Sequence, residues 1–439
     1  SNRDLYTVAT DGKDKTLHRI SDTPKSENGA VWIARGSRIA FMYPDEKGSM
    51  QMWTMLPDGS NRLQASDVEG GIGGFLLSPD EKKIVIIGNV KYSRNAADIY
   101  PDLPQATGRV VDDLMYKHWD EWVTEIPHPF VGDFDGSKVS GLKDIMADEP
   151  FEAPMKPFGG VESFAWHPDS KMLVYVSRKK TGLEYAVSTN SDLYIYNLEN
   201  GETHNLTEGM NGYDTMPAFS PDGKYLAWLS MEHDGYESDK NRLFLLDCFT
   251  AEKRDLTAAW DYTIDEFAWA PDGRQIFFIA PKDGVAPVFA IDTRTAKVTT
   301  LVNEQADYTS LAPADSKTIV TMRHSMLRPN EIVRIDIDRR GRVSSTPLTD
   351  VNGPVFAQLS MPTVEKRMVP TTDGKEMLTW IVFPPKFDAQ KKYPSILYCQ
   401  GGPQQAVSQF WSYRWNFALM ASNGYVMIAP NRRGLPGFG

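Results

Sequence analysis

The sequence contains two short segments whose residue types could act directly on a ligand. The first is the loop Gln400-Gly401-Gly402-Pro403, which follows the apolar run 393–399. Glycines lack a Cβ, so the backbone N–H groups of such a loop can approach a ligand closely and donate to an oxygen that gains negative charge during a reaction. The alternative interpretation is a structural turn that only ends a strand.

The second segment is YKHWDEW (116–122), in which Asp120 and Glu121 lie between Trp119 and Trp122. A carboxylate at a fixed depth in a cavity binds an ammonium group strongly where water is excluded. The alternative is that both tryptophans pack this segment onto the rest of its domain while the two acids face water.

The elements that must position these segments follow from an internal repeat in residues 1–360. A turn of the Pro-Asp type recurs, and an apolar strand starts four residues after its acidic position. The copies are Asp80 before Ile84, Asp169 before Leu173, Asp222 before Leu226, Asp272 before Ile276 and Asp315 before Ile319, with a degenerate copy at Arg35 before Ile39. A second hairpin follows each turn, at 52–65, 129–145, 193–207, 243–257, 288–302 and 332–349.

This repeat predicts an all-β propeller. The acidic positions are 89, 53, 50 and 43 residues apart, and four strands per 40–50 residues are typical of one propeller blade. We count about seven blades, the last of which combines a hairpin at 5–20 with a strand at 355–360. The longest gap holds one blade and an insertion of about 40 residues near 90–128, and loops of that length are usually functional or disordered.

Residues 361–439 have a different pattern. The segment 372–385 predicts a strand hairpin, and 393–399 and 425–430 predict two buried strands. Between them, 404–422 is apolar at helical spacing and ends at Asn423-Gly424, a typical helix C-cap. A strand, a helix and a strand with continuous apolar strands indicate a parallel sheet.

The motifs of this region, taken with the propeller repeat, resemble the prolyl oligopeptidase family of serine peptidases. They are DGKEMLTWIVFP (373–384), YCQGGP (398–403) and GYVMIAPNRRGLPGFG (424–439). YKHWDEW and HDGYESDKNRLFLLD (233–247) resemble the family's acylaminoacyl-peptidase-like and bacterial dipeptidyl-peptidase V-like branch. The resemblance covers essentially the whole chain. It implies a seven-bladed β-propeller in residues 1–360, followed in 361–439 by a linker and the beginning of an α/β-hydrolase domain.

Members of this family use a Ser–Asp–His triad in which His activates a serine held on a G-x-S-x-G turn. The sequence contains no such pentapeptide, and all seven histidines precede residue 361. We therefore expect the triad to lie outside these residues, in a parent protein longer by roughly 240 residues on the basis of family domain size, and this chain alone to be inactive.

The resemblance assigns the Gly-Gly-Pro loop to the oxyanion hole. We expect the Gly402 N–H to donate, with the Gly401 N–H as the near alternative. Gln400 stands where relatives often have His or Tyr, and its amide could donate in place of a phenol.

A dipeptidyl peptidase selects substrates by holding their α-ammonium group, and the candidate for this role is Glu121, with Trp119 as a neighbouring wall and Asp120 as the second choice. Arg433 and Arg432 could contact a substrate carbonyl or form an interdomain salt bridge. Glu237 is expected to be a solvated loop acid.

The predicted function is that of a serine exopeptidase that releases N-terminal dipeptides from oligopeptides. Acylaminoacyl peptidase and oligopeptidase activities are the near alternatives. A non-catalytic propeller that binds a peptide or protein explains residues 1–360 equally well, but not the motifs after residue 361. A homodimer and a periplasmic or secreted location are implied by the resemblance alone.

Composition limits the remaining possibilities. The formal charge of −11 argues against a nucleic-acid partner, and no apolar run approaches the roughly 18 residues of a membrane span. Cys248 and Cys399 are predicted to be buried free thiols rather than a disulfide. His118 and His128 have no second ligand at metal spacing, so we predict no metal site and no cofactor.

Overall fold

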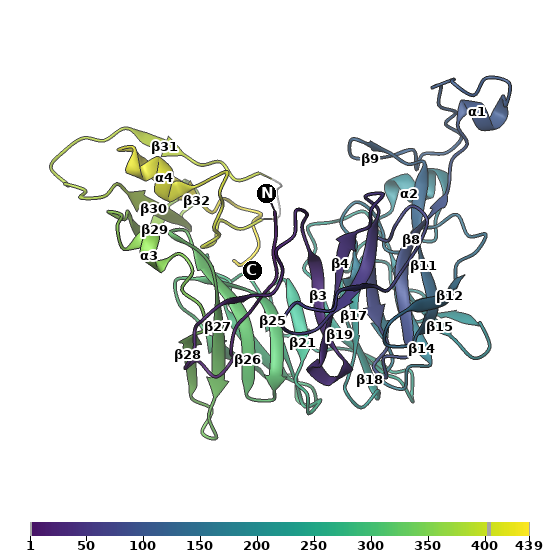
Figure 1. The fold of residues 1–439 in the computed structure, drawn as a ribbon. Coiled ribbons are helices and arrows are strands. Elements are labelled where there is room, and N and C mark those ends of the chain that lie inside the picture. Colours follow the sequence, from purple (N-terminus) through teal and green to yellow (C-terminus); the bar gives the residue numbers. More distant parts are fainter. Residues whose placement is uncertain (1, 402–404, 439) are drawn as a thin grey trace. The chain divides into compact units, whose positions relative to one another are not determined.

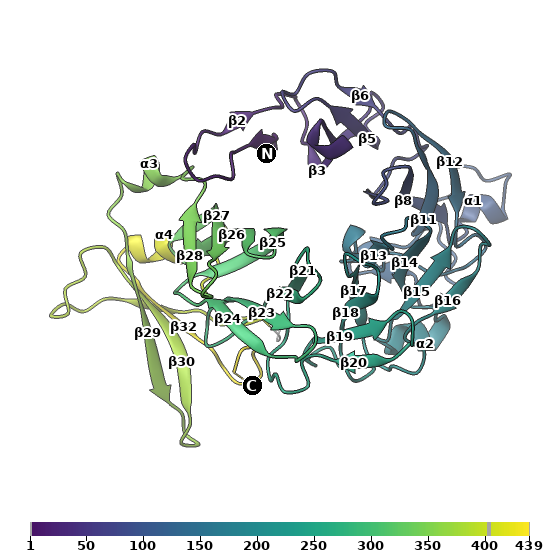
Figure 2. The ribbon, with the colours of Figure 1, turned by 90° about the horizontal axis from the view of Figure 1, so that it is seen from below.

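A computed structural model describes residues 2–401 and 405–438 of the chain. Six four-stranded antiparallel sheets repeat along the sequence, and within one sheet the strands follow one another in space, as β25 to β28 do in Figure 2. This is the β-propeller architecture that the repeat predicts. The strands are β3–β6 (Asn28–Ile33, Arg38–Pro44, Met50–Met55, Leu63–Gln64), β7, β8, β11 and β12 (Gly74–Leu77, Lys83–Lys91, Glu125–Phe134, Val139–Asp144), β13–β16 (Phe164–Trp166, Met172–Ser177, Asp192–Asn197, Thr203–Asn205), β17–β20 (Asp214–Phe219, Tyr225–Ser230, Arg242–Asp247, Lys253–Asp255), β21–β24 (Glu266–Trp269, Gln275–Ile279, Val288–Asp292, Val298–Val302) and β25–β28 (Asp307–Asp315, Thr318–Ser325, Arg328–Ile337, Val343–Pro347).

The recurrent Pro-Asp turns join the first two strands of a blade through a local hydrogen-bond pattern. In the turn between β17 and β18, Asp222 Oδ1 accepts from Ser220 Oγ at 2.8 Å and from the Lys224 N–H at 3.2 Å. Gly223 has φ +73°, a left-handed conformation that suits glycine. The hydrogen bonds to Lys224 and Ser220 lower the pKa of Asp222 to about 2. The local sequence therefore fixes both the turn and the register of the strands beside it.

Two details of the predicted propeller are wrong. Residues 355–360 do not form a strand, because Gly353–Phe356 form the short helix α3 and a turn follows it. Of the seventh blade, the described residues contain only the hairpin β1–β2 (Tyr6–Thr7 and His18–Arg19).

Both cysteines are free as predicted, but Cys248 and Cys399 are exposed rather than buried.

The described residues form two compact units, whose boundary runs through the fourth blade. Unit 1 consists mainly of residues 18–239, and unit 2 consists mainly of the chain from Asp255 onward. This division differs from the domain boundary near residue 360 that the sequence suggests, since blades five and six share unit 2 with the segment that follows them. The boundary at residue 360 stays a prediction.

Unit 1 contains the long insertion between β8 and β11. Its elements are the one-turn helix α1 (Ala96–Ile99) and the hairpin of β9 (Lys117–His118) and β10 (Glu121–Trp122). Figure 1 shows α1 at the outer end of this insertion. Met115 and Val123 of the insertion pack with Ile126 of β11 and Val90 of β8 in a small apolar cluster, so the insertion is packed onto its blade. The helix α2 (Gly182–Val187) and two 3₁₀ turns (Ala34–Gly36 and Val161–Ser163) complete the unit.

Unit 2 adds a mixed sheet of its own to blades five and six. Its strand order is β29-β30-β32-β31, with bounds Thr363–Pro370, Glu376–Phe383, Val426–Pro430 and Ser395–Leu397. β31 and β32 are parallel, as expected for the beginning of a hydrolase sheet, and the helix α4 (Phe417–Ser422) packs on β30 and β32 (Figure 1). Trp380, Val382, Phe417 and Met427 fill the core between them.

The predicted helix 404–422 is mostly wrong. Only Phe417–Ser422 is helical, with Asn416 as the N-cap and Gly424, at φ +88°, after its C-terminal end; Gln404 lies outside the described residues. Residues 405–416 are irregular because long-range partners hold them. Asn431 Oδ1 accepts from the Val407 N–H at 2.8 Å, and the Val407 carbonyl accepts from Trp380 Nε1 at 3.0 Å.

Asp307, the first residue of β25, fixes the same irregular segment to blades five and six. Its side chain is 3% exposed. Oδ1 accepts from the backbone N–H groups of Ala286 (2.9 Å) and Gln409 (3.1 Å), and Oδ2 accepts from Ser408 Oγ (2.6 Å). Hydrogen bonds to an ionised acceptor are stronger than neutral ones, so one carboxylate joins three separate parts of unit 2.

We predict that Asp307→Ala lowers the free energy of unfolding by about 2–4 kcal/mol, because it leaves three buried donors without an acceptor. Asp315→Ala, at the exposed end of the same strand, should cost less than about 1 kcal/mol. Urea unfolding of the two variants measures the difference. Equal losses would show that the Asp307 contacts do not stabilise unit 2.

Candidate functional site

The Gly-rich loop opens onto a cavity in unit 2. The cavity has a volume of about 750 Å³ and is lined by residues of the loop, of the irregular segment after it and of blade five. The lining residues are Asp265, Pro281, Ala286, Tyr398, Gln400, Gly401, Gln405, Ala406, Ser408, Phe410, Ser412, Trp415 and Pro436. The cavity is large enough for a short peptide segment, within the usual range for ligand sites.

The loop itself follows directly from the short strand β31. A Cβ built on Gly401 would meet no atom of the described residues within 4 Å, so none of them blocks the approach of a ligand to this backbone. Gln400 Nε2 donates to Gln405 Oε1 at 3.2 Å, so one N–H of the side-chain amide is engaged within the loop. Gly402, the residue that we expected to donate, lies outside the described residues, and so does Pro403.

Aromatic side chains pack around Tyr398, two residues before Gln400, the first residue of the loop. The ring of Tyr398 packs edge-on against Phe417, with a centroid distance of 4.9 Å, and lies 6.2 Å from Phe410. Burial raises the pKa of the Tyr398 hydroxyl above its ordinary value. The prediction of a buried strand at 393–399 is wrong for the described residues, since Leu397 is 60% exposed. The Tyr398 ring packs on its aromatic neighbours and so holds one side of the strand end from which the loop starts.

Unit 1 presents the second candidate segment on the β9–β10 hairpin. Glu121 pairs with His118 across the hairpin, and Trp119 at its tip has φ +58°. Trp119, Asp120 and Glu121 all line one hollow of about 420 Å³. The structure thus brings together the three residues that the sequence singled out.

The two tryptophans of this hairpin have different surroundings. Trp119 is 78% exposed and touches the equally exposed Phe158 edge-on, at 5.6 Å between ring centroids. Trp122 lies under the guanidinium of Arg109 at 4.6 Å and under the ammonium of Lys117 at 5.0 Å. Trp122 packs within the insertion, whereas most of the Trp119 ring is exposed. Asp120 and Glu121 are both exposed, as the packing interpretation expects, so the role of this segment stays a prediction.

A buried carboxylate anchors the hairpin to the blades. Glu152 is 3% exposed, and its Oε1 is 2.5 Å from His118 Nε2. Its other oxygen accepts from the Tyr185 hydroxyl at 3.2 Å. Burial and the nearby charge of Glu152 raise the pKa of the Tyr185 hydroxyl, which stays a donor. Nothing in the local sequence around Glu152 signals this role, since its partners are 34 and 33 residues away.

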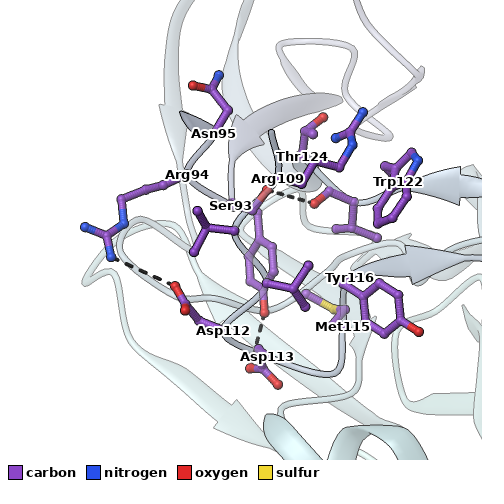
Figure 3. Close-up of a pocket in the computed structure, with 14 residues that line it drawn as sticks. Ser93, Arg94, Asn95, Arg109, Asp112, Asp113, Met115, Tyr116, Trp122 and Thr124 are labelled. Atoms are coloured by element: carbon purple, nitrogen blue, oxygen red, sulfur yellow. Dashed lines mark hydrogen bonds and ion pairs between the residues drawn. The ribbon is translucent and has the colours of Figure 1, made fainter. Parts of the chain in front are cut away.

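A second hollow lies inside the insertion (Figure 3). It measures about 260 Å³ and shares Trp122, Val123 and Thr124 with the hollow at Glu121. The Tyr92 hydroxyl donates to Asp113 Oδ2 at 3.4 Å. Burial and the charge of Asp113 raise the pKa of Tyr92 to about 12.

The other candidates have local partners. Arg433 forms an ion pair with Asp373, in the turn between β29 and β30, so its partner lies within the segment after residue 361 rather than across a domain interface. Arg432 donates to the Arg433 carbonyl at 3.1 Å. Glu237 is exposed in a loop of the fourth blade.

The described residues include no group of three or more His, Cys, Asp or Glu side chains arranged to hold a metal ion. In the same part of the chain, no helix is long and apolar enough to cross a membrane.

Comparison with known proteins agrees with this architecture. A family model described as the TolB beta propeller domain matches residues 161–358. The chain is 50% identical over 439 residues to a protein named dipeptidyl-peptidase 5 from Porphyromonas gingivalis, and 47% identical over 435 residues to one of the same name from Porphyromonas endodontalis. It spans 63% and 62% of the lengths of these two relatives, while they match 100% and 99% of the chain.

Solved structures share the fold at low sequence identity. The acylaminoacyl peptidase of Pyrococcus horikoshii superposes with a TM-score of 0.73 at 18% identity, covering 99% of this chain and 64% of that one. A puromycin-hydrolyzing peptidase of Mycobacterium tuberculosis gives a TM-score of 0.64 at 16% identity, covering 96% of this chain and 62% of that one. The predicted fold class, a propeller followed by the start of a hydrolase domain, is confirmed.

We predict that Glu152→Ala loosens the β9–β10 hairpin, because His118 and Tyr185 lose their buried acceptor. Amide hydrogen exchange in residues 117–123 should become at least about tenfold faster, since opening this hairpin exposes few apolar contacts. The exposed Glu184→Ala on α2 is the control and should leave these amides unchanged. Identical exchange in both variants would mean that the hairpin is held by other contacts.

Proposed function

Because the chain is homologous over its whole length to proteins named dipeptidyl-peptidase 5, in the prolyl oligopeptidase family that its motifs resemble, we propose that it is part of a serine exopeptidase that releases N-terminal dipeptides from oligopeptides. The observation that carries this proposal is the glycine loop at the end of a strand parallel to β32, open to a cavity of about 750 Å³. A binding propeller has no need of such a loop or of the additional sheet. The serine, aspartate and histidine of the reaction are expected in a part of the protein outside these 439 residues.

The role of this chain in the reaction is to bind the peptide substrate and to stabilise the negative charge that forms on the carbonyl oxygen. A serine hydroxyl that attacks the scissile carbonyl turns its oxygen into an oxyanion, and backbone N–H groups stabilise that charge. In this chain the donor is the Gly402 N–H or the Gly401 N–H. The supported strand end would hold the donor without reorganisation during the reaction.

Selection of a free N-terminus requires a carboxylate that meets the α-ammonium group. Glu121 supports this role through its position on an ordered hairpin and its exposure to a hollow walled by Trp119. An acylated N-terminus has no positive charge and would leave this carboxylate unpaired. The charge of the N-terminus therefore distinguishes dipeptidyl peptidase activity from acylaminoacyl peptidase activity. The second activity is the other candidate because the chain shares its fold with the acylaminoacyl peptidase of Pyrococcus horikoshii.

Two further properties remain part of the proposal. Resemblance to bacterial enzymes that scavenge peptides supports a periplasmic or secreted location, which cell fractionation would test. The same resemblance supports a homodimer, which light scattering of the full-length protein would test.

In the full-length protein, Glu121→Gln and Glu121→Ala should lower kcat/KM for dipeptidyl reporter substrates by about 10- to 100-fold, the size expected for one lost bond to a charged group. Asp102→Asn removes an exposed acid of the same insertion that lines neither hollow; it is the matched control and should change kcat/KM by less than about threefold. Steady-state kinetics with a coumarin reporter measures both. Wild-type rates in the Glu121 variants would remove this residue from substrate binding.

A further inference from the structure

The wall of the unit 2 cavity contributed by blade five carries a carboxylate that the sequence did not single out. Asp265 directly precedes β21 and lines the same cavity as Gln400 and Gly401. Its backbone N–H donates to the Ile279 carbonyl at 2.9 Å, and the preceding Ile264 is fully buried. The backbone at this position is therefore fixed, while the side chain remains exposed to the cavity.

The neighbouring acids accept hydrogen bonds, and the Asp265 side chain accepts none in the described part of the chain. Glu266 accepts from the backbone N–H groups of Ser310 (2.9 Å) and Leu311 (2.6 Å). Asp307 has the three donors described above. Among the residues that the structure describes, the Asp265 carboxylate has no hydrogen-bond or ion-pair partner.

The surroundings of Asp265 disfavour an isolated negative charge. Protein atoms around the carboxyl group displace part of its hydration, and the charges of Asp307 and Glu266 add to the effect, so the pKa of Asp265 lies above its ordinary value. A positive charge beside it would offset both effects.

The described lining of the cavity supplies no such positive charge. None of its residues is Lys or Arg, and most are apolar, aromatic or amide side chains. The nearby Lys282 is engaged elsewhere, since its ammonium lies over the rings of Tyr262 at 5.1 Å and Trp260 at 5.6 Å. The described lining thus contains one carboxyl group, that of Asp265, which is available to a ligand.

From this arrangement we propose that Asp265 binds an ammonium group of the peptide substrate in the cavity at the Gln400–Gly401 loop. The proposal rests on the proposed function, because that function puts a peptide in this cavity. A peptide has two sources of an ammonium group, its N-terminus and a lysine side chain. Both present the same N–H donors to the carboxylate, so substrates must distinguish them.

The test uses the full-length protein with the variants Asp265→Asn, Asp265→Glu and Asp261→Asn. Asp261 is an exposed acid four positions earlier, so its variant removes the same charge from the same blade without touching the cavity lining. The reporters are Ala-Ala-coumarin, Lys-Ala-coumarin, Ala-Lys-coumarin and propionyl-Ala-coumarin. The last has nearly the size of Ala-Ala but lacks the amine.

If Asp265 binds the α-ammonium group, Asp265→Asn should lower kcat/KM for Ala-Ala-coumarin by at least about tenfold, mainly through KM, and leave propionyl-Ala-coumarin unchanged. If it binds a lysine side chain, the loss should appear for a lysine-containing reporter and spare Ala-Ala-coumarin. In either case Asp265→Glu should recover part of the activity, and Asp261→Asn should match the wild type.

An equal loss for all four reporters, or no loss beyond that of Asp261→Asn, would overturn the proposal. Failure of the proposed function would look different. In that case the wild type would cleave propionyl-Ala-coumarin and Ala-Ala-coumarin at equal rates. Comparison of the Ala-Ala and lysine reporters would still show whether Asp265 binds a side-chain ammonium group. Thermal melting of each variant identifies any change that comes from loss of folding, and Asp265→Glu then carries the comparison.

Discussion

The hydrogen bonds of Asp307 are the interaction on which unit 2 depends. One buried carboxylate joins Ala286 of blade five to Ser408 and Gln409 of the segment that follows the glycine loop. That segment cannot form a helix while these bonds persist, because they hold the backbone in an irregular path. Trp380 and Asn431 bind Val407 from the hydrolase sheet. The cavity therefore has walls from two kinds of sheet, and neither kind alone would form it.

A similar principle governs the insertion of unit 1. A two-stranded hairpin is at best marginally stable in isolation, and β9 and β10 contain only two residues each. Glu152 compensates by accepting from His118 and Tyr185 in a nearly water-free position. The tip can then keep Trp119 exposed and in a left-handed backbone conformation. Such a rigid base with an open tip is suited to presenting Glu121 to a ligand.

In each unit, the acids near the candidate residues divide into two groups. Asp307, Glu266 and Glu152 are saturated by donors and serve the fold, whereas Glu121 and Asp265 face open space. A carboxylate that is partly removed from water and has no partner has an unfavourable free energy, and a bound cation would lower it. This contrast, more than the number of acids, supports a cationic substrate group. It is also consistent with the overall charge of −11, which would repel anionic ligands.

The sequence by itself determined the blades, the strands of the hydrolase sheet and the position of the glycine loop after a strand. It could do so because turns and strand alternation depend on neighbouring residues. The roles of Glu121 and Trp119 were implied by the family resemblance and stay predictions. Only the tertiary structure decided that residues 405–416 are not helical, that 355–360 add no strand, that Arg433 pairs with Asp373, and that Asp265 is left without a partner. Most of these outcomes depend on groups far apart in sequence, such as Asp307 and Gln409, which are separated by 102 residues. Local periodicity reports burial, but it contains no information about which distant donor or acceptor will be present.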